Sequence, residues 1–143
     1  MERAAAGDPV TLTAPTVMEV AAGLQSAAAN DRRFSGSLDW WVRTVHSELV
    51  EVVGLDRYAA VVAGRLRARR PLPPSPRRKG LSKPDARAGW VLDLQIAACA
   101  WTAGRDVTTD NRDDFLVISD EIAALYPQAS RLGVLAPPAP ADA

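Results

Sequence analysis

The feature of this sequence that most constrains its fold is a regular alternation of short apolar runs with longer amphipathic stretches. Residues 10–13 and 49–53 are brief, rich in β-branched side chains and bounded by Pro or Gly, which predicts strands. Residues 106–108 and 132–135 predict two further short strands. The stretches between these runs have apolar side chains at helical spacing. Because helices that separate strands usually connect parallel neighbours, the order predicts an α/β domain with a mostly parallel central sheet.

Local capping and stop signals set the ends of the predicted helices. Thr16 and Glu19 have the spacing of a Thr-x-x-Glu capping box, and Asp56 precedes an apolar stripe that Pro71 would end. Gly104 suits the end of a helix of small apolar residues. We expect the charged residues between the third strand and the last helix to form a loop. The predicted helices cover residues 16–30, 37–45, 56–70, 90–103 and 120–126.

The length of the chain bounds its organisation, because 143 residues suit one compact domain with its own core. We assign that domain to residues 10–135, with a flexible lead-in at residues 1–9 and a disordered, Pro-rich tail at residues 136–143. Residues 71–87 are rich in Pro, Arg and Lys and predict a basic loop. The sequence has no signal core or transmembrane run, and its one cysteine, Cys99, excludes an internal disulfide, so we expect a cytoplasmic protein in which Cys99 is packed.

Charge is balanced over the whole chain but segregated along it. Seventeen Lys and Arg residues match seventeen Asp and Glu residues. Residues 65–87 hold nine cations and one acid, whereas residues 106–121 hold six acids and one base. Carboxylates bind hard cations such as Mg²⁺ and basic side chains bind polyanions, so this division suits an enzyme that cleaves phosphodiesters with a metal ion. A solvated surface gives the same composition, so the pattern alone leaves both interpretations open.

Two motifs give the charge pattern a more specific meaning. One begins at Asp93, continues through small apolar residues to Gly104, and is followed by a strand and by Thr109, Asn111, Asp114 and Phe115. It resembles the C-terminal half of the PIN-domain family, approximately D-x-x-I-A-A-x-A, a glycine, a strand and T-x-N-x-x-D-F. Upstream, Glu19-Val20-Ala21-Ala22-Gly23-Leu24 resembles the E-x-x-x-G-L motif of the same family. The resemblance covers roughly residues 10–135 and points to the VapC-type toxins.

The resemblance implies a three-layer α/β/α fold and an endoribonuclease of a toxin–antitoxin system. It implies that Glu19, Asp93 and Asp114 bind Mg²⁺ or Mn²⁺, which activates a water molecule for hydrolysis of RNA, and that Asn111 positions that water or the substrate. It also implies a homodimer and a cognate antitoxin, with no membrane partner. We expect the RNA backbone to be held by basic residues of the Pro-rich segment, namely Arg77, Arg78, Lys79 and Lys83.

Other interpretations of the same residues stay open. The N-terminal strand of the family, which ends in an aspartate and lies in the middle of the sheet, has no counterpart here, and Asp8 precedes the first predicted strand. The chain is therefore either an enzyme or a catalytically impaired PIN-like module that binds antitoxin or RNA without cleavage. In an unrelated α/β domain, Glu19 would only complete the capping box of Thr16, and Asp93 would only stabilise a helix N-terminus.

Overall fold

The computed structural model describes residues 7–74 and 80–140 of the chain. It shows a mixed α/β protein in which helices alternate with short strands, and the strand pairs within the described ranges are parallel. Within the described residues, the strands form two small two-stranded sheets. The chain divides into two compact units, unit 1 (Met1–Gly54) and unit 2 (Leu55–Ala143), each of which is described by itself.

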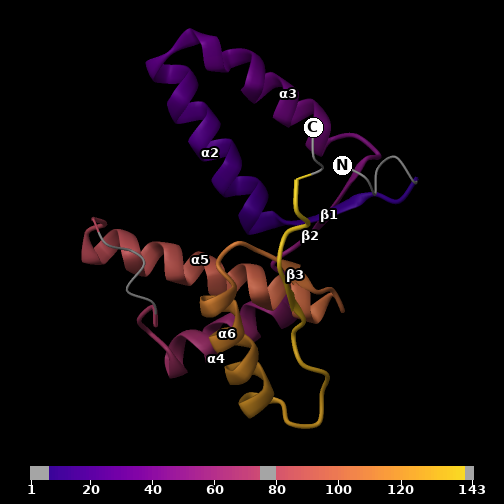
Figure 1. Ribbon diagram of the computed structural model, residues 1–143, viewed down its shortest axis with the longest axis vertical. Helices are drawn as coiled ribbons and strands as arrows, with labels where there is room; N and C mark the ends of the chain where they lie inside the picture. Colours follow the sequence, from indigo (N-terminus) through magenta and orange to yellow (C-terminus); the bar gives the residue numbers. More distant parts are fainter. Residues whose placement is uncertain (1–6, 75–79, 141–143) are drawn as a thin grey trace. The chain divides into compact units, whose positions relative to one another are not determined.

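Unit 1 consists of one parallel strand pair and a helical hairpin. Its elements are β1 (Val10–Thr13), α2 (Ala14–Asn30), the 3-10 turn η1 (Arg32–Phe34), α3 (Ser35–Val45) and β2 (Val50–Val53). Strand β1 pairs with β2 from Val10 opposite Val50 to Thr13 opposite Val53. Figure 1 shows α2 and α3 folding back on each other as the crossover between the two strands.

The predicted capping box at the start of α2 is wrong. The helix begins at Ala14, and its N-cap is Thr13, whose Oγ1 accepts a hydrogen bond of 3.3 Å from the backbone N–H of Thr16. Pro15 fits the first turn because the N–H that proline lacks would have no partner within the helix there. The sequence offers two threonines three residues apart, and the earlier one caps the helix, so Glu19 lies beyond the capping position.

Little of unit 1 is buried. Thr13 and Pro15 are its buried residues within the described part of the chain, whereas Met18, Trp40 and Leu49 are each more than half exposed. A groove between α2 and α3 is lined mainly by small or apolar side chains, including Ala21, with Asp39 and Arg43 at the same surface. The helical hairpin therefore keeps much of its apolar surface uncovered.

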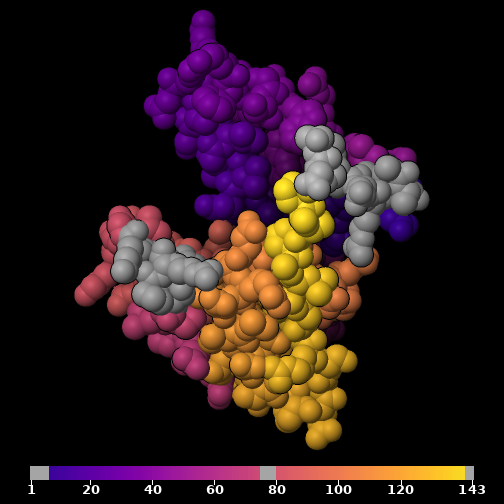
Figure 2. Space-filling view, in the orientation of Figure 1, coloured from indigo at the N-terminus to yellow at the C-terminus, as the bar shows by residue number. Residues whose placement is uncertain are grey.

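The described residues of unit 2 form three helices and the second strand pair. Its elements are α4 (Arg57–Arg69), α5 (Lys83–Thr102), β3 (Val107–Thr108), α6 (Arg112–Leu125) and β4 (Val134–Leu135). Helix α4 packs along α5, and α6 contacts both of them, as Figure 1 shows. In Figure 2, the atoms of α6 and of the segment that follows it form one continuous face of this unit.

The three helices of unit 2 enclose an apolar core. Ala59, Val62 and Leu66 lie on one face of α4, at the spacing that the sequence predicts for its apolar stripe. Trp90 of α5 is fully buried, and its indole Nε1–H donates a 2.6 Å hydrogen bond to the backbone oxygen of Arg70 just beyond the end of α4. Asp56 caps α4 as predicted, because its Oδ1 accepts from the N–H groups of Tyr58 and Ala59. The hydrogen bond of the buried Trp90 thus holds the C-terminal end of α4 against the core of unit 2.

Two helices of unit 2 begin earlier than predicted. Helix α5 begins at Lys83 because Ser82 caps it by accepting a hydrogen bond from the N–H of Asp85. Residues 83–87, which were predicted to belong to the basic loop, are therefore helical. Helix α6 begins at Arg112, and residues 112–115 are helical instead of forming a loop. Acidic residues in the first turn stabilise the helix N-terminus, and Phe115 begins the buried stripe that continues through Ile118 and Ile122.

The second sheet is short and depends on a close approach of two chain segments. The N–H of Val107 donates to the oxygen of Gly133 at 2.8 Å, and the N–H of Thr109 donates to the oxygen of Leu135 at 3.0 Å. A Cβ atom on Gly133 would overlap the carboxyl group of Asp106. Glycine at this position therefore lets β4 lie beside the start of β3. Within residues 7–74 and 80–140, no helix combines the length and the apolar character needed to cross a membrane.

Candidate functional site

The candidate site in unit 2 begins where β3 ends. The Oγ1 of Thr109 accepts a 3.0 Å hydrogen bond from the backbone N–H of Asn111, and this bond turns the chain from the strand into α6. Asn111 then occupies the N-cap position of α6, and its backbone oxygen accepts from the N–H of Phe115. The local sequence therefore places polar side chains at the junction of a strand end and a helix start.

Asp114 is the buried acid of this junction. It is 2% exposed, and its Oδ2 accepts a 2.9 Å hydrogen bond from the side-chain Nδ2 of Asn111. The N-terminus of a helix carries a partial positive charge, which stabilises a carboxylate in the first turn. Asp110 and Asp113, which lie close to it in the sequence, are exposed. Asn111 and Asp114 are thus two predicted site residues that the structure brings into direct contact.

Asp93 lies near the middle of α5 and is partly buried. The interpretation of Asp93 as a residue that merely stabilises a helix N-terminus is wrong, because α5 begins ten residues earlier, at Lys83. Trp90, three residues earlier, and Leu94, the next residue, are buried, so Asp93 lies beside the face of α5 that packs in the core. The position of Asp93 therefore needs an explanation other than the helix dipole.

The remaining predicted site residues lie elsewhere. Glu19 belongs to unit 1, where it is exposed on α2. Lys83 is exposed at the first position of α5. Three further basic residues predicted to bind RNA lie outside the described residues, namely Arg77, Arg78 and Lys79.

The described residues supply oxygen donors of the kind that Mg²⁺ or Mn²⁺ binds, but no complete cluster. In that part of the chain, no three His, Cys, Asp or Glu side chains lie together in an arrangement that could hold a metal ion. The fit to a divalent cation therefore rests on the donor chemistry of Asp114 with its neighbour Asn111, and on Asp93.

Contacts between α4 and α6 include several polar groups that the sequence analysis did not single out. Glu121 of α6 accepts hydrogen bonds from the Nε atoms of Arg69 at 2.5 Å and of Arg70 at 2.9 Å. These two arginines lower the pKa of the Glu121 carboxyl below its usual value. The residues are 51 and 52 positions apart in the sequence, so no local motif could have paired them.

An aromatic cluster lies at the far end of α6. The ring centres of Tyr126 and Trp101 are 4.9 Å apart, and the guanidinium carbon of Arg65 lies 4.8 Å from the Tyr126 ring centre. The indole Nε1–H of Trp101 donates to the backbone oxygen of Ser130 at 2.7 Å. The sequence does not predict this cluster, because Tyr126 before Pro127 indicates only the end of a helix.

Cys99 lies in the core of unit 2, as the sequence predicts for a small packed residue. It is 1% exposed, and its burial raises the pKa of the thiol to about 11. Because the thiolate is the reactive form, this environment makes Cys99 inert toward electrophiles and metal ions in the folded state.

Comparison of the chain with protein-family models, with curated proteins and with solved structures found no match. The interpretation of the site therefore rests on the residues and on the geometry described above.

Proposed function

We propose that this chain is a metal-dependent endoribonuclease of a toxin–antitoxin system, built on a PIN-like three-layer α/β/α fold. The observation that carries the proposal is the junction of β3 and α6, where Asn111 holds the buried carboxylate of Asp114. The side chains at this junction have the spacing of the T-x-N-x-x-D-F motif. They follow the carboxyl end of a parallel strand, where ligands gather in α/β proteins.

The chain's own residues have distinct roles in this proposal. Asp93 and Asp114 would hold a divalent cation, and Asn111 fixes the orientation of the Asp114 carboxylate through the 2.9 Å hydrogen bond. Glu19 lies in unit 1, and its role as a metal ligand stays a prediction. When bound, the cation supplies Lewis-acid activation of water and neutralises charge on the phosphate. Basic residues of the Pro-rich segment hold the RNA backbone, namely Arg77, Arg78, Lys79 and Lys83. A homodimer and a cognate antitoxin complete the proposal.

The test is cleavage of a structured RNA pool with Mn²⁺, using the parent chain and matched variants. Asp114→Asn and Asp93→Asn keep the side-chain shape but remove the negative charge, and we expect them to abolish Mn²⁺-dependent cleavage. Asn111→Ala removes only the partner of Asp114, so its activity should fall about 10- to 100-fold. Asp110→Asn is the matched control, because it neutralises an exposed acid just before the N-cap of α6. Its activity should match that of the parent.

Two outcomes would overturn the proposal. Cleavage that persists in Asp114→Asn or in excess EDTA would show a contaminant or a different site. RNA binding without Mn²⁺-dependent cleavage by the parent chain would assign the molecule to the alternative, a PIN-like module that binds RNA or antitoxin without catalysis.

A further inference from the structure

Helix α4 carries an unusual concentration of one side-chain type. Its 13 residues include four arginines and no acid, and Arg70 follows directly. All five arginines are exposed, while the opposite side of the helix packs into the core of unit 2. Glu121 offsets part of this charge at Arg69 and Arg70, whereas Asp56 is engaged as the N-cap. The exposed side of α4 is therefore cationic, which suits a polyanion.

Aromatic rings lie among these arginines. Tyr58 is 64% exposed, and the guanidinium carbon of Arg57 lies 5.2 Å from the centre of its ring. Arg65 lies over the ring of Tyr126, which is backed by Trp101. Val61, between Tyr58 and Arg65 in sequence, is 61% exposed. Exposed rings and flat guanidinium groups stack well on nucleic acid bases, because every base has a π face.

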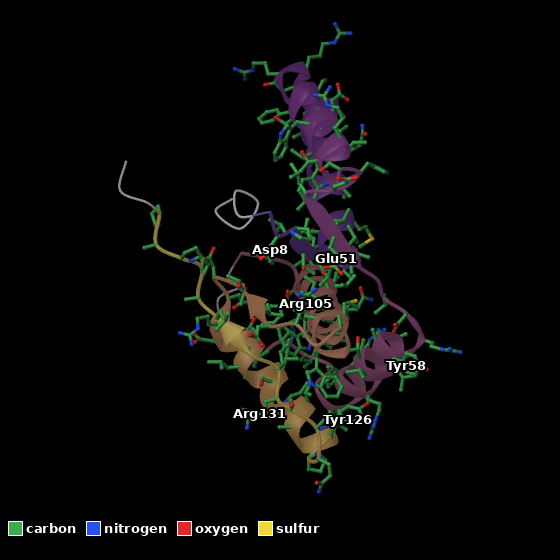
Figure 3. The ribbon with its side chains drawn as sticks, turned by 90° about the vertical axis from the view of Figure 1, so that its right-hand side faces the viewer. Asp8, Glu51, Tyr58, Arg105, Tyr126 and Arg131 are labelled. Carbon is green, nitrogen blue, oxygen red and sulfur yellow. The ribbon has the colours of Figure 1, made fainter. Side chains whose placement is uncertain are left out.

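The two stacking groups are spaced along one flank of the helix. Tyr58 and Arg65 are seven residues apart, which brings them to nearly the same side of α4 at a separation of about 10 Å along its axis. In Figure 3, Tyr126 lies between Tyr58 on one side and Arg131 on the other. A flexible single strand can follow such a row, whereas the bases of a duplex are stacked on each other and cannot reach it.

We propose that this surface binds single-stranded RNA through stacking of bases on Tyr58 and on the guanidinium group of Arg65. The surface comprises Arg57, Tyr58, Val61, Arg65 and Tyr126 and is called the arginine–tyrosine face. The choice of RNA as the polymer rests on the proposed function, but the stacking surface is separate from Asn111 and Asp114. It also differs from the basic segment that the sequence assigns to RNA binding.

The test measures binding of a short fluorescein-labelled oligouridine to the full chain by anisotropy, in EDTA so that cleavage does not interfere. Tyr58→Ala should weaken binding about tenfold, because it removes the ring on which a base stacks. Tyr58→Phe keeps the ring and should bind like the parent. Arg65→Lys keeps the charge but loses the flat guanidinium group, so it should weaken binding without changing the salt dependence. Arg131→Gln is the matched control, because Arg131 is an exposed arginine that pairs with Asp120 instead.

Salt dependence separates stacking from simple charge attraction. Arg57→Gln should reduce the slope of log affinity against log salt by about 0.7, as expected for the loss of one phosphate contact on a single strand. Tyr58→Ala should leave that slope unchanged. Thermal melting of each variant checks that the fold is retained, which the exposure of Tyr58 favours.

Several outcomes would overturn this inference. Unchanged binding in both Tyr58→Ala and Arg65→Lys would exclude stacking, and an equal loss in Arg131→Gln would show nonspecific charge attraction. Capture of an acidic protein that depends on Tyr58, without RNA binding that does, would assign the face to a protein partner. Binding is measured without metal, so the two proposals can fail separately. If RNA binding depends on Tyr58 but the chain cleaves no RNA, only the proposed nuclease function is contradicted. If the chain cleaves RNA but the arginine–tyrosine face does not contribute to binding, only this inference is contradicted.

Discussion

Unit 1 and unit 2 both combine helices with a pair of parallel strands, but their apolar side chains have different environments. In unit 2, Leu66, Trp90 and Ile118 are at most 1% exposed. In unit 1, the large apolar residues Met18 and Trp40 are 58% and 56% exposed. Apolar burial is the main favourable contribution to folding, so unit 2 has a core of its own, while the helical hairpin of unit 1 has none within the described residues. We therefore expect the two units to differ in local stability and in response to truncation of side chains.

The largest expected difference concerns the accessibility of a thiol in each unit. Cys99 should react with a thiol reagent at least about a thousandfold more slowly in the folded protein than in denaturant, because the core must open first and domains of this kind are stable by about 5–15 kcal/mol. A cysteine introduced by Val42→Cys, in a Cys99→Ala background, should react at once, since Val42 is 46% exposed on α3. Stopped-flow labelling at neutral pH measures both rates. Fast labelling of native Cys99 would show that the core of unit 2 opens readily, contrary to the comparison.

A matched pair of tryptophan substitutions gives the next largest effect. Trp90→Ala should lower the free energy of unfolding by about 3–5 kcal/mol, because it leaves a cavity and removes the donor to the Arg70 oxygen. Trp40→Ala removes an exposed ring and should change that free energy by about 0.5 kcal/mol or less. Urea denaturation followed by circular dichroism measures both values. A comparable loss in Trp40→Ala would mean that this side chain is covered in solution.

The smallest expected effect is a difference in acid sensitivity. Arg69 and Arg70 lower the pKa of Glu121 in unit 2 below its ordinary value of 4.5. The ion pairs therefore stabilise the fold fully above about pH 4.5, and this stabilisation is lost as the pH falls through the lowered pKa of the folded state. Glu121→Gln should cost about 1 kcal/mol at pH 7 and less at pH 3. Asp31 of unit 1 also has a lowered pKa because it pairs with Arg33, but the Arg33 side chain is 88% exposed, so solvent screens the pair and Asp31→Asn should leave the melting temperature unchanged. Melting curves at the two pH values test this, and an equal pH dependence in the parent and in Glu121→Gln would contradict it.

Features of the fold that depend on neighbouring residues could be predicted from the sequence. The Asp56 cap and the apolar stripe of α4 were predicted correctly, and so was the end of α5 near Gly104, which has a positive φ of 68°. The start of α6 was not, because the charged residues before Phe115 resembled a loop although acids in a first helical turn are favourable. The parallel pairing of the strands was predicted, but which short strand pairs with which was not, because that pairing is defined only by long-range contacts.

The same distinction applies to the candidate site. Asn111 and Asp114 were both predicted as site residues from their motif spacing, but the hydrogen bond between them was not predicted, because it forms at the start of a helix where a loop was expected. Whether Glu19 and Asp93 join them depends on how distant segments meet, and their metal-binding role stays a prediction. The contacts of Arg65 with Tyr126 and of Arg69 with Glu121 have no local signature, which is why sequence reasoning missed them.

The close approach of Gly133 to Asp106 has a consequence for how sequences of this kind can change. A side chain at position 133 needs the space that the Asp106 carboxyl occupies, so position 133 is not free to vary while that carboxyl stays in place. An alanine at 133 becomes acceptable only after Asp106 has been replaced by a smaller residue or has turned toward solvent. The two positions should therefore show strong epistasis in a library of double substitutions, and in natural relatives they should evolve as a pair.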